Sequence, residues 1–153
     1  MVRPLLEYGN AIWGPHYLSD VRNVESIQKR ATKLIPKLRN MTYKDHIMVL
    51  KLPSLKYRRR RGDMILMFKI MHGLVRVAVN DLFIPIESSR TRGHAKRVYK
   101  TPAIKHSRVF SFSRRVINDW NSLPEDVIES PTLNAFKNRL DEYWKQYMYE
   151  IVE

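Results

Sequence analysis

The chain has 153 residues, the length of one domain, and 44% of them are hydrophobic, which is enough for a packed core. It has no cysteine, so disulfides, cysteine-ligated metal sites and thiol catalysis are excluded. Lys and Arg number 28 against 15 Asp and Glu, and the resulting net charge of +13 favours an anionic partner, either nucleic acid or an anionic membrane surface.

The N-terminal part of the chain predicts two helices. Apolar spacing is typical of a short helix over residues 2–13. Ser19 and Asp20 are expected to cap a second helix that Pro36 ends. The predicted buried face of this second helix consists of Val21, Val24, Ile27, Ala31 and Leu34.

The strongest helix-end signals surround the longest predicted helix. Thr42 with Asp45 resembles a capping box for a short helix. Ser54 is expected to cap a helix over residues 55–72, and Gly73 to end it in the left-handed conformation. This helix begins with consecutive arginines and is apolar nearly all round in its second half. We therefore expect it to be solvated at its start and buried further on.

The second half of the chain predicts a loop region followed by two helices. Asn80 is expected to cap a single turn, and short extended segments are expected around Val98 and Ile104. A further helix ends at Pro124, and Ser130 is expected to cap the last one. The apolar faces of these two helices consist of Phe112, Val116, Ile117, Trp120 and Leu123, and of Leu133, Phe136, Leu140, Tyr143, Trp144 and Tyr147. All three tryptophans, Trp13, Trp120 and Trp144, are expected in the core.

These elements predict a mainly α fold: a small helical domain with a basic loop region and at most short β segments. Residues 1–85 form a helical region. Residues 86–153 add the basic loop and two helices, and we expect them to pack as one unit with the first region.

No pattern in the chain predicts catalysis. The adjacent carboxylates Glu125 and Asp126, and likewise Asp141 and Glu142, point to different helix faces and do not form a two-metal site. None of the five histidines has a partner at the spacing of a zinc site. Gly-rich phosphate loops and nucleophile elbows are absent. We expect no catalytic residue, no metal and no cofactor in this chain.

The basic residues are concentrated in the middle of the chain. Residues 51–115 hold 17 basic and 3 acidic side chains, and no carboxylate lies between Glu87 and Asp119. Such a stretch repels itself unless an anion neutralises it. The candidate phosphate-binding residues are Arg58, Arg59, Arg60, Arg61, Arg90, Arg92, His94, Lys96, Arg97, Lys100, Lys105 and Arg108.

Each candidate has a structural alternative. The four consecutive arginines can form a solvated helix start, with their aliphatic stems lying over the core. The aromatic residues Tyr99, Phe110 and Phe112 stand among cations and could stack on bases, but Phe110 and Phe112 lead into an amphipathic helix and are more typical of core residues.

Six segments, in order, resemble blocks that follow the polymerase palm in non-LTR (LINE-type, jockey-like) retrotransposon reverse transcriptases. They are RPLLEY (3–8) with Ile12, Trp13 and Pro15, ESIQKRAT (25–32), YRRRRGD (57–63), SRTRGH (89–94), VINDWNSLP (116–124) and FKNRL (136–140). The resemblance covers nearly the whole chain. It implies that residues 1–85 are thumb-like and that residues 86–153 form a C-terminal extension.

The resemblance implies a C-terminal fragment of an RNA-directed DNA polymerase. Such a fragment would grip an RNA–DNA hybrid or other duplex through backbone phosphates, with little sequence preference. The family's paired catalytic aspartates have no counterpart here, so the chain alone is expected to be inactive, although the full-length proteins it resembles are enzymes.

The net charge also bears on two other kinds of partner, acidic proteins and membranes. The chain could instead be a protein-interaction module that docks on an acidic protein or on the palm and fingers of the polymerase. A membrane partner is not expected, because the basic and apolar residues form no single long amphipathic helix and no apolar run approaches the roughly 18 residues of a span. We expect a nuclear or cytoplasmic protein that is not secreted.

Overall fold

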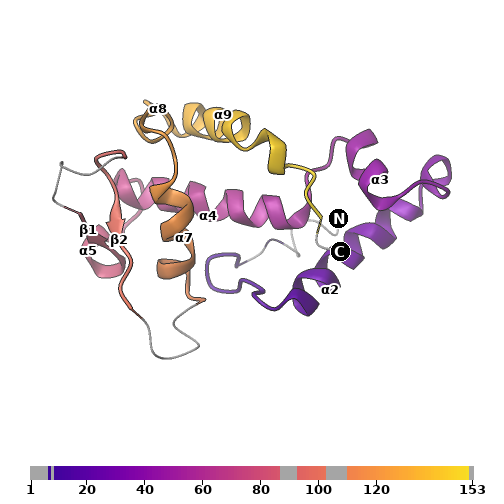
Figure 1. Ribbon diagram of the computed structural model, residues 1–153, viewed down its shortest axis with the longest axis horizontal. Coiled ribbons are helices and arrows are strands. Elements are labelled where there is room, and N and C mark those ends of the chain that lie inside the picture. Colours follow the sequence, from indigo (N-terminus) through magenta and orange to yellow (C-terminus); the bar gives the residue numbers. More distant parts are fainter. Residues whose placement is uncertain (1–6, 8, 87–92, 103–109, 152–153) are drawn as a thin grey trace. The chain divides into compact units, whose positions relative to one another are not determined.

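The structure is a computed structural model, and it describes residues 7, 9–86, 93–102 and 110–151. It is mainly helical with one small sheet, which confirms the predicted fold class (Figure 1). The elements are α2 (Leu18–Lys33), η1 (Pro36–Leu38), α3 (Tyr43–Val49), α4 (Leu55–Met71), α5 (Val79–Leu82), β1 (Ile84–Pro85), β2 (Val98–Tyr99), α7 (Phe112–Asn121), α8 (Glu125–Ile128), α9 (Leu133–Tyr143) and η2 (Lys145–Tyr147).

The chain divides into two compact units. The first unit consists of residues 1–60 and 144–153, and the second unit of residues 61–143. The boundaries therefore fall within α4 and at the end of α9, whereas the sequence suggested a boundary after residue 85. The two sequence-based regions were expected to pack together, and within the second unit Phe68 of α4 stacks on Phe136 of α9 with ring centroids 4.2 Å apart.

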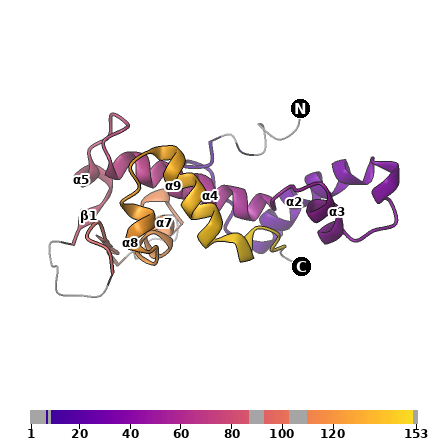
Figure 2. The same ribbon diagram turned by 90° about the horizontal axis from the view of Figure 1, so that it is seen from above.

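In the first unit, α2 packs against α3, and the two helices lie side by side in both views (Figures 1 and 2). Polar side chains make much of this contact. The Tyr43 hydroxyl donates to Glu25 Oε1 at 2.5 Å, and the Thr32 hydroxyl lies 3.0 Å from His46 Nδ1. Burial raises the pKa of Tyr43, and the adjacent Glu25 carboxylate raises it further, so the phenol keeps its proton for this bond.

The buried face of α2 is not the predicted one. The residues buried on this helix are Glu25, Gln28 and Thr32, whereas Leu34 is 81% exposed and Ile27 is 40% exposed. Of the apolar stripe predicted from periodicity, Val21 and Val24 are half-buried, and Ile27, Ala31 and Leu34 are exposed. Burial of a polar stripe is tolerated because hydrogen bonds offset the loss of water, as in the donation from Gln28 Nε2 to Pro53 O at 3.5 Å.

Three of the predicted helix ends are confirmed. Thr42 Oγ1 accepts from the Asp45 N–H at 3.3 Å while the Asp45 carboxylate accepts from the Thr42 N–H at 3.1 Å, which completes the capping box of α3. Ser54 Oγ accepts from the Tyr57 N–H at 3.3 Å at the start of α4. Gly73 adopts φ +65° just beyond the end of α4, a conformation that glycine tolerates without strain.

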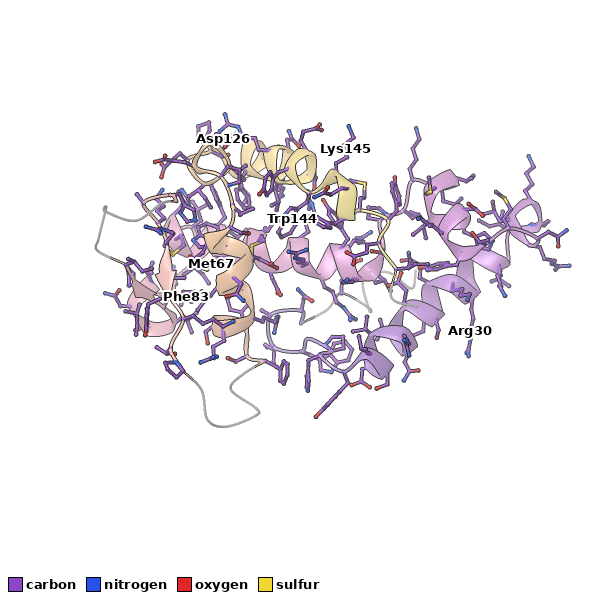
Figure 3. All side chains as sticks on the ribbon, in the orientation of Figure 1. Arg30, Met67, Phe83, Asp126, Trp144 and Lys145 are labelled. Carbon is purple, nitrogen blue, oxygen red and sulfur yellow. The ribbon has the colours of Figure 1, made fainter. Side chains whose placement is uncertain are left out.

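The second unit is built around aromatic and methionine side chains. Met64, Met67, Phe68 and Ile70 of α4 are all buried, which confirms the predicted burial of its second half. Trp120 is fully buried, and its indole N–H donates to Lys96 O at 2.8 Å. Met67 and Phe83, which are labelled in Figure 3, are both buried.

The sheet of the second unit is a two-stranded antiparallel ribbon. Ile84 pairs with Tyr99, and Pro85 pairs with Val98. The Asn121 side chain accepts from the Val98 N–H at 3.0 Å and donates to Val98 O at 2.8 Å, which ties β2 to the end of α7. The prediction of a short extended segment at Val98 is confirmed. The segment expected at Ile104 lies outside the described residues.

Several predicted caps and core positions were wrong. Tyr17, not Ser19 or Asp20, occupies the N-cap position of α2, because Ser19 and Asp20 already lie within the first turn. Asn80 lies inside α5, which begins after Ala78. Half of the predicted helix over residues 2–13, namely residues 2–6 and 8, lies outside the described residues, and residues 9–12 form a turn.

Two further positions, Ser130 and Trp13, differ from the sequence-based prediction. Ser130 does not cap α9, because the helix begins at Leu133 and Thr132 directly precedes it, where Thr132 Oγ1 accepts from the Ala135 N–H at 3.1 Å. The Ser130 hydroxyl donates to Val127 O at 2.7 Å. Trp13 is 53% exposed rather than buried. Trp120 and Trp144 are buried as predicted.

Candidate nucleic-acid interface

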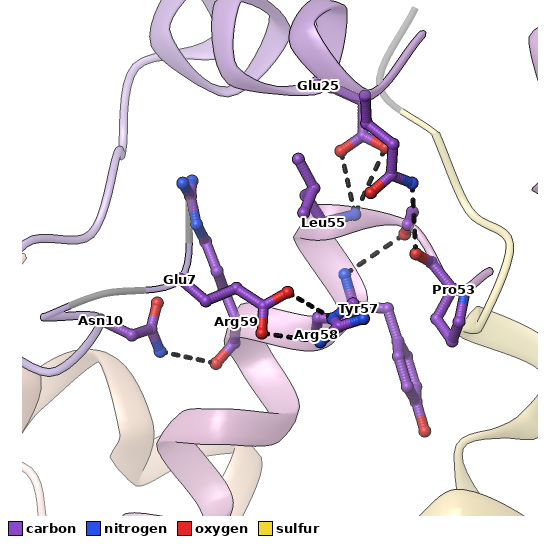
Figure 4. A network of polar contacts seen from close by, with 10 residues as sticks. Glu7, Asn10, Glu25, Pro53, Leu55, Tyr57, Arg58 and Arg59 are labelled. Carbon is purple, nitrogen blue, oxygen red and sulfur yellow. Dashed lines mark hydrogen bonds and ion pairs between the residues drawn. The ribbon is translucent and has the colours of Figure 1, made fainter. Parts of the chain in front are cut away.

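Two of the four consecutive arginines form ion pairs within the chain. Arg58 Nε lies 2.6 Å from Glu7 Oε1, and Arg58 also donates to Glu7 Oε2 at 2.7 Å (Figure 4). Arg61 makes a two-point contact with the Asp141 carboxylate, at 2.5 and 2.8 Å. Fork-to-carboxylate pairs of this kind are among the stronger charged contacts in proteins. A phosphate would therefore have to compete with Glu7 and Asp141 for these two guanidinium groups.

The other two arginines of the run lie on aromatic rings. The Arg59 guanidinium carbon is 5.0 Å from the centre of the Trp13 ring. The Arg60 guanidinium carbon is 4.5 Å from the Trp144 ring centre and 5.4 Å from that of Tyr147. Such cation–π contacts stabilise a guanidinium over the ring face, by about 0.5–1 kcal/mol at exposed sites. Because all four side chains are also half-buried, the run stabilises the start of α4 in addition to any binding role.

His94 is withdrawn from the surface. His94 is 1% exposed, and its Nε2 lies 2.9 Å from Trp120 O, so the neutral ring donates a hydrogen bond to that carbonyl. Burial lowers the pKa of His94 and the charge of Arg97 lowers it further, while the Trp120 carbonyl acts in the opposite direction. The net effect is a neutral, structural histidine, so we leave His94 out of the interface proposed below.

The stability of the second unit should depend on pH through His94. In the unfolded chain this side chain takes up a proton near pH 6.5, and in the folded chain only at lower pH, so acidification favours unfolding. As the pH is lowered below about 6.5, we expect the free energy of unfolding to decrease. The contribution of His94 to this decrease is at most ~1.4 kcal/mol per pH unit. Urea unfolding at pH 7 and pH 5.5 tests this. The difference should shrink in His94→Gln, and an unchanged pH dependence in that variant would contradict it.

The remaining basic candidates of the middle segment are only partly described. Lys96 Nζ lies 2.9 Å from His72 Nε2 and 3.3 Å from Glu129 Oε1, and Arg97 Nε donates to His94 O at 3.1 Å. Lys100 is exposed directly after β2. Arg90, Arg92, Lys105 and Arg108 lie outside the described residues.

A second group of cations, which charge counting by segment missed, lies on the first unit. We call the segment from α2 to the start of α3, residues 18–44, the basic arm. Its basic side chains are all exposed: Arg22, Lys29, Arg30, Lys33, Lys37, Arg39 and Lys44. Figure 3 shows Arg30 pointing away from α2. The arm was overlooked because the first fifty residues also hold four acids, and of these Glu25 is buried and Glu7 is paired with Arg58.

The described residues offer neither a metal centre nor a membrane span. Over residues 7, 9–86, 93–102 and 110–151, His, Asp and Glu side chains nowhere gather in a group that could hold a metal ion. Of the helices in that same part of the chain, none has both the length and the apolar character needed to cross a bilayer. The arrangement instead presents exposed ammonium and guanidinium groups.

Comparisons with known proteins do not extend this picture. No protein-family model, curated protein or solved structure matches the chain. The resemblance to non-LTR retrotransposon reverse transcriptases therefore stays a hypothesis that depends on the six sequence blocks. The candidate phosphate-binding residues therefore form two separate groups: the exposed cations of the basic arm, and the basic residues of the middle segment.

Proposed function

We propose that this chain binds nucleic-acid duplexes through their backbone phosphates, as the C-terminal part of a retrotransposon reverse transcriptase would grip its template–primer, and that it does so without a catalytic site of its own. The observation that carries the proposal is the one-sided charge of the basic arm. Residues 18–44 hold seven exposed cations and two acids, Asp20 and Glu25, and Glu25 is 7% exposed and hydrogen-bonded.

The chemistry of the arm favours phosphate over bases. Four of its seven cations are lysines, which act as point charges rather than as the planar forks that read guanine. Exposed cations release counterions from a polyanion when they neutralise phosphates, and this contribution to affinity is independent of sequence. The proposed grip therefore has little sequence preference. Any preference for RNA–DNA hybrid would come from duplex shape.

The test is a salt titration of duplex binding by fluorescence anisotropy, with DNA–DNA and RNA–DNA duplexes. If about five phosphates are neutralised, log affinity should fall with log salt at a slope of roughly −4 to −5. The variant R30Q/K33Q/K37Q should weaken all duplexes alike and flatten the slope by about 2 to 3. R90A/R92A/K96A/R97A tests the middle segment by the same measurement.

The matched control removes three cations elsewhere. K137Q/R139Q/K145Q has the same charge change as the variant of the basic arm, but Asp141, Glu142 and Glu150 are near these positions in sequence and repel phosphate. Its effect should be the smaller one. A salt-independent affinity, or equal losses from this control and from the arm variant, would refute the proposal.

A second candidate function is docking on an acidic protein surface. The observation that favours it is that the same part of the first unit exposes large apolar side chains, among them Leu34 at 81%, Val49 at 59% and Met48 at 50%. Apolar side chains beside cations fit a partner that is both acidic and apolar. This function becomes the better explanation if the wild-type chain binds neither duplex at low salt.

A further inference from the structure

A pocket of about 540 Å³ lies within the first unit, between α2 and the start of α3. Arg22, Glu25 and Lys29 follow one another at spacings of three and four residues, so α2 presents all three to the pocket from one face. Lys44 approaches from the first turn of α3. The sequence thus brings three cations and one carboxylate to the same depression.

The charges that line the pocket sum to about +2, from three cations and the single carboxylate of Glu25. That carboxylate is already occupied, because Oε1 accepts from the Tyr43 hydroxyl at 2.5 Å and Oε2 accepts from the Leu55 N–H at 3.1 Å (Figure 4 shows the latter). Within the described residues, neither Lys29 nor Lys44 forms an ion pair. Their ammonium groups are therefore available to an anionic ligand.

The Ser26 and Thr42 hydroxyl groups at the pocket already donate hydrogen bonds to other groups of the chain. Ser26 donates to Asn23 O at 2.6 Å, and Thr42 donates to Asp45 Oδ2 at 2.5 Å. A ligand would therefore be held by charge, through ammonium and guanidinium donors, rather than by neutral hydroxyls. This favours a ligand that accepts several charge-assisted hydrogen bonds, as phosphate oxygens do.

We propose that this pocket binds a phosphate monoester carried by a nucleoside, either a free nucleotide or the phosphorylated end of a strand. A monoester carries about −1.5 to −2 charges at pH 7, which matches the lining, whereas a backbone diester carries only one. The volume lies in the range of small-molecule sites, roughly 300–1,000 Å³, and exceeds what phosphate alone fills. Tyr43 and Ile151 supply apolar wall for the rest of the ligand.

The decisive test compares two double variants. One replaces two lysines that line the pocket, and the other replaces two lysines that lie outside it. Lys29 and Lys44 line it, whereas Lys33 and Lys37 belong to the same basic arm but do not. The binding of a nucleoside 5′-monophosphate, measured by calorimetry, should weaken by about 10-fold or more in K29Q/K44Q and by less than about twofold in K33Q/K37Q. The charge-preserving K29R/K44R should stay within about threefold of wild type.

The unphosphorylated nucleoside is the ligand control and should bind at least about 10-fold more weakly than the monophosphate. Equal losses in the two lysine pairs would overturn the proposal, because they would show only the general field of the arm. Equal binding of nucleoside and monophosphate would overturn it as well. Circular dichroism spectra of all variants should superimpose, since the four lysines are exposed.

Hairpin duplexes that carry either a 5′-phosphate or a 5′-hydroxyl distinguish the two possible ligands, a phosphorylated strand end and a free nucleotide. If a strand end is the ligand, the phosphorylated hairpin binds more tightly, and K29Q/K44Q removes the difference. If a free nucleotide is the ligand, the two hairpins bind alike while the monophosphate still binds. This inference is independent of the duplex grip. A chain that binds monophosphate but no duplex would refute only the proposed function, and a chain that binds duplex but no monophosphate would refute only the pocket.

Discussion

Replacement of Trp120 by alanine should lower the free energy of unfolding of the second unit by about 3–5 kcal/mol. The indole is fully buried, and its ring centroid lies 6.3 Å from that of Phe136. Its N–H donates to Lys96 O at 2.8 Å. Its removal leaves a large cavity and an unpaired carbonyl, and each of these costs free energy. The measurement is the urea midpoint. The Trp120→Phe variant, which keeps an aromatic ring, should lie between wild type and Trp120→Ala.

The matched control is Trp13→Ala. Trp13 is 53% exposed and contacts Arg59 through its ring face, so its loss should cost only about 0.5–1 kcal/mol. Similar shifts of the urea midpoint in the two alanine variants would show that the core of the second unit is not centred on Trp120.

Replacement of Asp63 by alanine should be the second most damaging change, at about 2–3 kcal/mol. Its carboxylate accepts two hydrogen bonds from Arg115, at 2.8 and 2.9 Å, and the two side chains are 11% and 21% exposed. The cost should lie between that of an exposed pair, near zero to 1 kcal/mol, and that of breaking a buried pair, about 3–5 kcal/mol. Unfolding of Asp63→Ala, Arg115→Ala and the double variant gives the coupling energy directly.

An exposed ion pair serves as the comparison for Asp63. Lys56 Nζ lies 2.8 Å from Glu150 Oε1, with side chains 39% and 47% exposed. Glu150→Ala should therefore change stability by no more than about 0.5 kcal/mol. If Asp63→Ala were equally mild, or if the double-variant cycle gave no coupling, the Asp63–Arg115 pair would not contribute to the fold.

The features that were predicted correctly depend on short stretches of chain. The capping box of Thr42 and Asp45 needs only neighbouring residues, and so do the Ser54 cap and the left-handed Gly73. The burial of α2 was not predictable in this way. Periodicity locates an apolar stripe, but the partner helix decides which stripe is covered, and α3 covers Glu25, Gln28 and Thr32.

The candidate site was only partly predictable for a related reason. Counting charges along the chain identified the arginine run, but not its partners Glu7 and Asp141, which are 51 and 80 residues away in sequence. The same counting lowered the net charge of the N-terminal segment by including Glu25, whose side chain is buried in the fold. Net charge per segment measures accessible charge only when no acid in the segment is buried or paired.

The composition of the first unit has a consequence for synthesis on the ribosome. This unit needs residues 144–151, because Ser54 N–H donates to Met148 O at 3.0 Å and Trp144 packs edge-on against Tyr57. All of the second unit is translated between the two parts of the first. The α2–α3 pair of the nascent chain therefore lacks its contacts with residues 144–151 while residues 61–143 are being synthesised. A released chain that ends at residue 143 should therefore have a protease-sensitive N-terminal region and a folded second unit.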